Sequence, residues 1–193
     1  TCHARHNNSS PCRISGQGVA PGRRSPCSSH PQHTLKQAYI LERRGRAFYA
    51  KTAEHTSIPG LKDIFTTLAE EEGKHIEYLD ERFSEIAESG SFPDGEAAPP
   101  DGSGRLADAV LTEGIKNSID AAEYEAAAIS AAIELEKRSI SLYSERARDA
   151  EDERERKFYR SLAVWEDGHL ELLVKLNEEV LESIWNENNF WPF

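Results

Sequence analysis

The amino-acid sequence predicts an all-α protein built as a bundle of four long helices. Apolar residues recur with a helical period in four long stretches, and the second pair of stretches repeats the first after a shift of 94 residues. The length of 193 residues is enough for one domain with a sizeable core but short for two. We therefore expect a single domain in which two similar helix pairs pack together.

Residues 1–34 precede the helical pattern and differ from the rest in composition. They are rich in Ser, Pro, Gly and Arg, have almost no large apolar residues and show no period, so we expect a disordered tail or leader. The composition is similar to that of an organelle transit peptide, and an expression leader or a misassigned start fits as well. All three cysteines lie in this segment, which leaves the body compatible with a reducing cytoplasm.

The remaining elements follow from period and from helix-breaking residues. The four long helices are expected at residues 35–56, 60–88, 120–150 and 153–185. Asp120 can cap the third helix while Glu123 reaches back in a box-like arrangement. The two pairs, 35–88 and 121–185, are joined by residues 89–120, a Gly, Pro and acid-rich linker followed by a short helix near 105–117. Residues 186–193 are an aromatic C-terminal tail, which either packs back on the bundle, forms a dimer contact or docks on a partner.

Each helix has one inward stripe in which acidic residues or histidines replace some of the apolar residues. The stripe of the first helix is Leu35, Tyr39, Glu42, Tyr49 and Ala53. That of the second is Ile64, Leu68, Glu72, His75, Leu79, Phe83 and Ile86. The third contributes Ile129, Ile133, Glu136, Ile140 and Tyr143. The fourth contributes Phe158, Leu162, Glu166, His169, Leu173, Leu176 and Val180.

The repeat identifies which charged residues of the stripes matter. The identical pairs are Leu41/Leu135, Glu42/Glu136, Arg44/Arg138, Tyr49/Tyr143, Ala53/Ala147, Leu68/Leu162, Ala69/Ala163, Glu72/Glu166, His75/His169, Glu77/Glu171 and Leu79/Leu173. Within the run "AEEEGKH", Glu70 and Glu71 correspond to Val164 and Trp165, whereas Glu72 and His75 recur unchanged. We therefore assign Glu70 and Glu71 to the helix surface, and Glu72 and His75 to a site.

These recurring residues predict a dinuclear metal site. Residues three apart on a helix lie on the same side, so each Glu-x-x-His pair can converge on one point. Four carboxylates buried together without a cation would repel one another strongly, and protonation or metal coordination relieves this. Four carboxylates and two imidazoles at a bundle centre are typical of di-iron and di-manganese proteins. The candidate ligands are Glu42, Glu72, His75, Glu136, Glu166 and His169; the alternative is a vestigial bundle without metal.

Two tyrosines and one further histidine lie near this pattern. Tyr49 and Tyr143 each follow a candidate glutamate by two helical turns on the same face, so they are either core aromatics or hydrogen-bond donors to a ligand carboxylate. We name both as candidate residues of the site, beside the metal. His55 has no counterpart in the repeat and is assigned to the surface.

The segments "LERRGRAFYAKTAEHTSIPGLKDIFTTLAEEEGKHIEYL" and "LEKRSISLYSERARDAEDERERKFYRSLAVWEDGHLELL" resemble the two halves of a rubrerythrin-type ferritin-like domain. The resemblance covers residues 35–185 and implies an antiparallel four-helix bundle with one long crossover at 89–120. It also implies that Glu42 and Glu136 are terminal ligands, that Glu72 and Glu166 bridge two irons, and that His75 and His169 each bind one iron.

Two departures from that family bear on activity. Full-length rubrerythrins carry a rubredoxin-like iron site built from paired CxxC motifs, which this sequence lacks. They also have an extra glutamate three residues after the ligand of the third helix, where this sequence has Ser139. Both departures weaken the expectation of efficient peroxidase turnover.

The function expected from the sequence is that of a redox-active di-iron protein, a ferroxidase or peroxide-scavenging oxidoreductase that reacts with dioxygen or hydrogen peroxide and takes electrons from an unknown donor. Two iron ions are the expected cofactor, and the same ligands also suit manganese or zinc. Two alternatives stay open: a ferritin-like iron-storage protein in a larger assembly, and a metal-stabilised structural bundle without catalysis.

Charge and hydropathy limit the partners. The net charge is −11, and because residues 1–34 carry four arginines and no acid, the remainder carries about −15. Such a body repels nucleic acid and attracts metal cations. No stretch approaches the roughly 18 to 20 apolar residues that span a bilayer, so we expect a soluble protein with no membrane partner. We also expect a cytoplasmic location, because the body lacks cysteines, and a homodimer.

Overall fold

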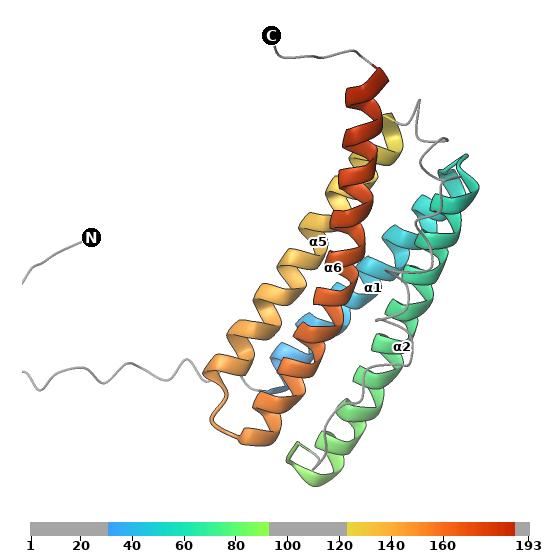
Figure 1. Cartoon of the computed structure of the whole chain (residues 1–193). Helices are drawn as coiled ribbons and strands as arrows, with labels where there is room; N and C mark the ends of the chain where they lie inside the picture. The colour runs from blue at the N-terminus through green and yellow to red at the C-terminus, as the bar shows by residue number, and fades with distance from the viewer. Residues whose placement is uncertain (1–30, 93–122, 188–193) are drawn as a thin grey trace, which may run out of the picture.

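The structure is a computed structural model, and it describes residues 31–92 and 123–187 (Figure 1). These residues form four α-helices, α1 (Pro31–His55), α2 (Pro59–Ser89), α5 (Glu123–Asp149) and α6 (Glu153–Glu187). The prediction of an all-α four-helix bundle is confirmed. The expected short helix near 105–117, the cap at Asp120 and tail residues 188–193 lie outside the described residues.

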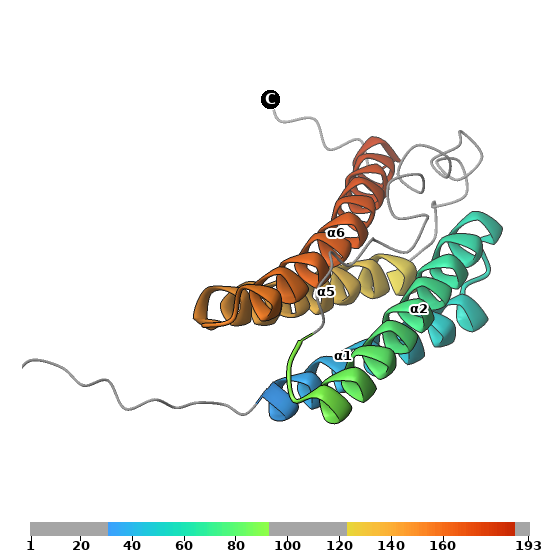
Figure 2. The ribbon, with the colours of Figure 1, turned by 90° about the horizontal axis from the view of Figure 1, so that it is seen from below.

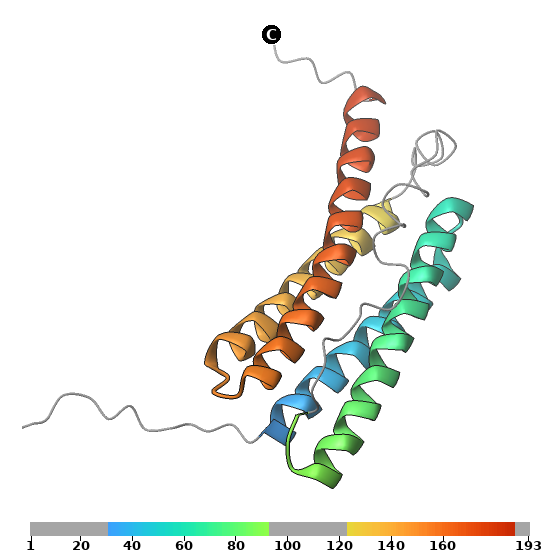
Figure 3. The same cartoon turned by 60° about the horizontal axis from the view of Figure 1, so that its bottom comes forward.

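The helices are arranged as two antiparallel hairpins, α1 with α2 and α5 with α6 (Figure 2). Between the hairpins, the backbones approach each other most closely along α1 and α5. Figure 3 shows that α2 ends at one end of the bundle and that α5 begins at the other. The chain that joins them therefore connects opposite ends of the bundle, as a ferritin-like crossover does.

Local sequence signals explain both ends of α2 and the start of α6. Pro59 occupies the first turn of α2, where its missing N–H costs nothing. Gly90 ends that helix with φ 74°, a left-handed conformation that glycine adopts without strain, and its N–H donates to the carbonyl oxygen of Ile86 at 2.9 Å. At the start of α6, Asp152 Oδ1 accepts the backbone N–H of Arg154 at 2.8 Å, which satisfies a donor of the first turn.

The first helix begins earlier than the sequence predicts. Residues 31–34, which we assigned to the tail, belong to α1, and Thr34 is buried. A proline at the first helical position is favourable, and Thr34 lies one turn before Ala38 on the buried face, so the stripe extends further back than its large apolar residues indicate.

Two apolar clusters fill the interior, one towards each end of the bundle. One includes Tyr49, Leu61, Phe65, Ile129, Leu172 and Leu176. The other includes Leu35, Leu79, Tyr143, Phe158, Tyr159 and Trp165. The acidic residues and histidines of the inward stripes lie in the layer between these clusters, so water is excluded from both sides of that layer.

The exposure of Phe83 shows that its assignment to the inward stripe of the second helix is wrong. Its side chain is 37% exposed and, with Ile40 at 48%, lines a surface groove between α1 and α2. The helical period predicts that Phe83 faces inward. In the structure, however, Phe83 lies beside α1 of its own hairpin rather than against the opposite hairpin. Among the described residues, no helix combines the length and the apolar character needed to cross a membrane.

Candidate metal centre

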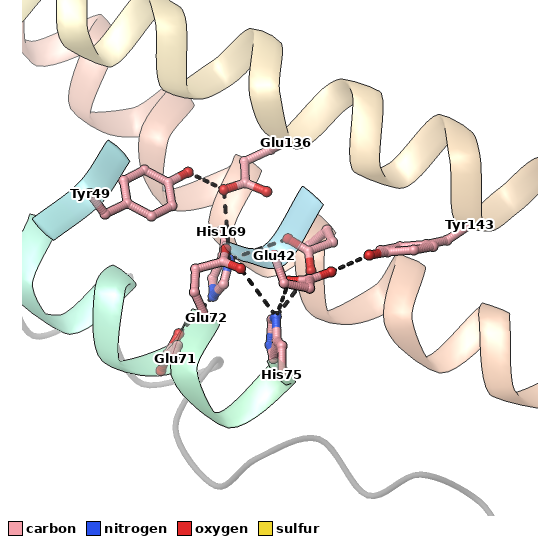
Figure 4. Close-up of polar contacts among 9 residues, drawn as sticks. Glu42, Tyr49, Glu71, Glu72, His75, Glu136, Tyr143 and His169 are labelled. Atoms are coloured by element: carbon pink, nitrogen blue, oxygen red, sulfur yellow. Dashed lines mark hydrogen bonds and ion pairs between the residues drawn. The ribbon is translucent and has the colours of Figure 1, made fainter. Parts of the chain in front are cut away.

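Six ionisable side chains from all four helices meet at the centre of the bundle (Figure 4). Helix α1 contributes one glutamate and α5 another, while α2 and α6 each contribute a glutamate and a histidine three residues later. Each of the six is at most 2% exposed. They are the residues that the sequence singled out: Glu42, Glu72, His75, Glu136, Glu166 and His169.

The six side chains form two overlapping groups rather than one. In each group, one ligand atom from every member lies within 4.8 Å of the others. The first group is Glu42, Glu72, His75 and Glu166, and the second is Glu72, Glu136, Glu166 and His169. Because Glu72 and Glu166 belong to both, the arrangement suits two cations that share two carboxylates.

Both imidazole rings turn their Nδ1 atoms towards the carboxylates. Nδ1 of His75 lies 3.2 Å from Glu42 Oε2 and 3.1 Å from Glu166 Oε1. Nδ1 of His169 lies 3.4 Å from Glu72 Oε1 and 3.5 Å from Glu166 Oε2. The two rings are nearly parallel, with centroids 5.2 Å apart and an interplanar angle of 17°. Each group therefore has one nitrogen donor facing oxygen donors.

Three atoms of this cluster that could bind a metal make no well-aligned hydrogen bond, although charged groups lie near them. They are Glu136 Oε2, Glu166 Oε1 and Nδ1 of His169, all buried. A buried polar atom without a partner is costly, and native structures rarely leave several together unless something else binds them. Carboxylate oxygens and imidazole nitrogens suit divalent iron, manganese and zinc. The donor set thus fits metal ions.

The electrostatics show the strain of assembling these groups without a cation. Burial, together with the neighbouring carboxylates, raises the pKa of Glu72 and of Glu136 well above the usual value. Burial alone would lower the pKa of His75, but Glu166 and Glu42 beside it raise that pKa from 6.5 to about 9. Burial would likewise raise the pKa of Glu166, yet the two imidazoles hold it well below its usual range. When no metal is bound, protons on these groups would offset part of the negative charge of the cluster.

The two tyrosines donate hydrogen bonds to carboxylates across the repeat. Tyr49 donates to Glu136 and Tyr143 donates to Glu42. Hydrogen bonding to a candidate ligand was one of the two roles open to these residues, and the structure adds that each tyrosine serves the glutamate of the other half. The bonds tie α1 to α5 twice and fix the orientation of both carboxylates.

The burial of Glu71 corrects the prediction that this residue, like Glu70, lies on the helix surface. Glu70 is exposed as expected, but Glu71 is buried, and its Oε2 accepts the Nε2 proton of His169 at 2.8 Å. The helical period did not indicate this role because Glu71 lies at the edge of the α2 stripe, where burial depends on α6. The repeat contained a signal, since the corresponding residue, Trp165, is large, apolar and buried.

His55 and Ser139 lie outside this cluster. His55 is exposed, as predicted, and its Nδ1 is 2.9 Å from the carbonyl oxygen of Lys51. Ser139, at the position of the family's extra glutamate, is buried on α5 one turn after Glu136. Residue 139 corresponds by the repeat to Gly45.

Gly45 gives Glu72 the space that it occupies. A Cβ atom at position 45 would lie 3.1 Å from Cδ of Glu72 and 3.3 Å from each of its carboxylate oxygens, closer than ordinary contact. By contrast, a Cβ atom at Gly73 would be 3.7 Å from the guanidinium of Arg46, which is ordinary contact. Gly45 and Gly73, which both lie within helices, therefore form a matched pair for a test.

We expect Gly45→Ala to displace the shared carboxylate and to weaken divalent-metal binding about tenfold. Gly73→Ala should leave metal binding unchanged and stabilise the protein by roughly 0.5–1 kcal/mol, because alanine is the better helix former. Metal titration and urea unfolding of both variants would measure this. Equal metal affinity in the two variants would contradict the role given to Gly45.

Comparison with known proteins agrees with this architecture. No curated protein and no solved structure matches the chain. The family model described as "Rubrerythrin" matches residues 33–177, about three quarters of the sequence, and the matched range includes α2, α5, nearly all of α1 and most of α6. With the two-hairpin fold and the paired Glu-x-x-His motifs in place, the chain belongs to the rubrerythrin family.

Proposed function

We propose that the central cluster binds two iron ions and that the protein is a non-haem di-iron carboxylate protein, reactive towards dioxygen or hydrogen peroxide. The observation that carries this proposal is the pair of four-residue groups sharing Glu72 and Glu166. Membership of the rubrerythrin family supports iron over the other metals that suit these donors.

Each residue has a distinct part in this proposal. Glu72 and Glu166, which belong to both groups, would hold both ions, and Glu42 and Glu136 would each hold one. His75 and His169 would each offer their Nδ1 nitrogen to one of the ions. Tyr49 and Tyr143 act through hydrogen bonds, holding the terminal carboxylates in place rather than contacting a metal.

The surroundings of the cluster favour controlled redox chemistry. When bound, the two irons supply the electrons that reduce dioxygen or peroxide. The chain supplies carboxylates, which tolerate changes of charge and denticity, and imidazole nitrogens that limit how many positions stay open. Apolar clusters on both sides exclude bulk water from the layer in which this occurs.

The test is to load chelator-treated protein with Fe(II) under anaerobic conditions and then add oxygen or peroxide. We expect two irons per chain and a rise in the near-ultraviolet absorbance of oxidised iron. Failure to bind iron would overturn the proposal as a whole. Iron binding without any response to either oxidant would overturn the redox activity and favour the metal-stabilised structural bundle. Solution mass measured on the same sample tests the expected homodimer against a storage assembly.

A further inference from the structure

The two histidines of the cluster, which are equivalent in the repeat, have different neighbours on the side that faces away from the carboxylates. On the outer nitrogen of His169, the carboxylate of Glu71 accepts a hydrogen bond at 2.8 Å. The corresponding neighbour of His75 is Trp165, whose ring stacks on that imidazole with centroids 5.1 Å apart and an interplanar angle of 27°. Tyr78 packs edge-on against Trp165, with centroids 5.0 Å apart. One histidine thus has an anionic hydrogen-bond acceptor, and the other has an aromatic cover.

The two positions are built from the same kinds of ligand. Both positions share Glu72 and Glu166, and each adds one terminal glutamate that accepts a hydrogen bond from a tyrosine. Within residues 31–92 and 123–187, no carboxylate is hydrogen-bonded to Nε2 of His75. The carboxylate of Glu71 on an outer imidazole nitrogen is therefore a contact that the His169 position has and that the His75 position lacks among these residues.

A carboxylate on the outer nitrogen has known consequences for a histidine ligand. It fixes the tautomer with the proton on Nε2, so that the lone pair of Nδ1 points at the metal, and it makes that nitrogen a stronger donor. Removing such a partner typically costs about 10–100-fold in metal affinity. Stacking on Trp165 orients the ring of His75 but provides no acceptor for its proton.

We infer that the two metal positions are inequivalent and that the position built on His169 and Glu136 fills first, with Glu71 as its positioning residue. This rests on the proposed dinuclear centre and adds an order of filling that the near-symmetric repeat does not indicate. A divalent cation should bind the His169 position about 10–100-fold more tightly than the position built on His75 and Glu42. At limiting metal, the protein should hold one ion in a defined place rather than a mixture.

The probe is Co²⁺ alone, titrated into the chelator-treated full chain and followed by its visible absorbance. Wild-type protein should show two steps. Glu136 and Glu42 each belong to one group, so E136Q should remove the tight step and E42Q the weak one. E71Q should weaken the tight step about 10–100-fold and leave the other unchanged. E70Q alters the exposed neighbour and should match wild type.

The possible results distinguish a failure of the filling order from a failure of the dinuclear centre itself. If wild-type protein binds no Co²⁺, the dinuclear centre itself fails, and the filling order fails with it. If two ions bind with equal affinity, if E42Q removes the tight step, or if a folded E71Q titrates like wild type, the filling order alone is wrong. The comparison of E42Q with E136Q leaves Glu71 intact, so it decides the matter even if E71Q does not fold.

Discussion

Replacing Glu166 with glutamine should abolish tight binding at both metal positions, whereas replacing Glu136 should affect one. Glu166 belongs to both four-residue groups, and its two oxygens approach both imidazoles, at 3.1 Å from His75 and 3.5 Å from His169. Glutamine keeps the shape but removes the negative charge that both cations would share. We expect each affinity to fall by more than about a hundredfold, since loss of a direct ligand exceeds the loss of a supporting contact.

The measurement is the number of Fe(II) or Co²⁺ ions that remain bound after gel filtration, with circular dichroism as the check on folding. Asp167→Asn is the matched control, because it removes the same charge from the next residue of α6, whose side chain is exposed. It should retain two ions per chain. An E166Q protein that still binds two ions tightly would mean that Glu166 is not shared between the positions.

Raising the pH should destabilise chelator-treated protein much more than metal-loaded protein. The pKa of His75 is about 9 in the folded chain, against a usual 6.5, because burial is outweighed by Glu166 and Glu42. The folded state therefore holds this proton more tightly than the unfolded state. Its contribution to stability is complete below about pH 6.5 and is lost as pH rises towards 9, a loss of about 3 kcal/mol for this group.

The buried carboxylates act in the same direction. Burial raises the pKa of Glu72 and of Glu136, so ionising them as pH rises also costs stability. Glu166, whose pKa is lowered by the imidazoles, contributes stability that is lost only in acid. A bound cation replaces the protons and removes most of this dependence.

Urea unfolding at pH 6.5 and pH 9, with and without Co²⁺, measures both effects. The stabilisation by metal should grow with pH. A His75→Gln variant in chelator should show a shallower fall, because it lacks the group with the raised pKa. If chelated wild-type protein is more stable at pH 9 than at pH 6.5, the protonated cluster does not stabilise the fold and the expected pH dependence is wrong.

The sequence by itself determined the presence of the four helices and the inward position of the six candidate ligands. A helix has a fixed period, so a spacing of three or four residues states which side chains share a face without reference to any other element. The recurrence of Glu72 and His75 as Glu166 and His169 then predicts that these polar residues face the interior of the bundle. All four are at most 1% exposed in the structure.

Only the tertiary structure shows which residues of different helices contact each other and which residues a neighbouring helix buries. That Tyr49 pairs with Glu136 and Tyr143 with Glu42 follows from the axial offset of α1 against α5, which no single helix specifies. The same holds at the edges of the stripes, where a residue is buried only if a neighbour covers it. Glu71 is covered by α6, and Phe83 is not covered by any described element to the same degree. The helical period determines the direction in which a side chain points around the axis of its helix. Packing determines which residues of other helices that side chain contacts.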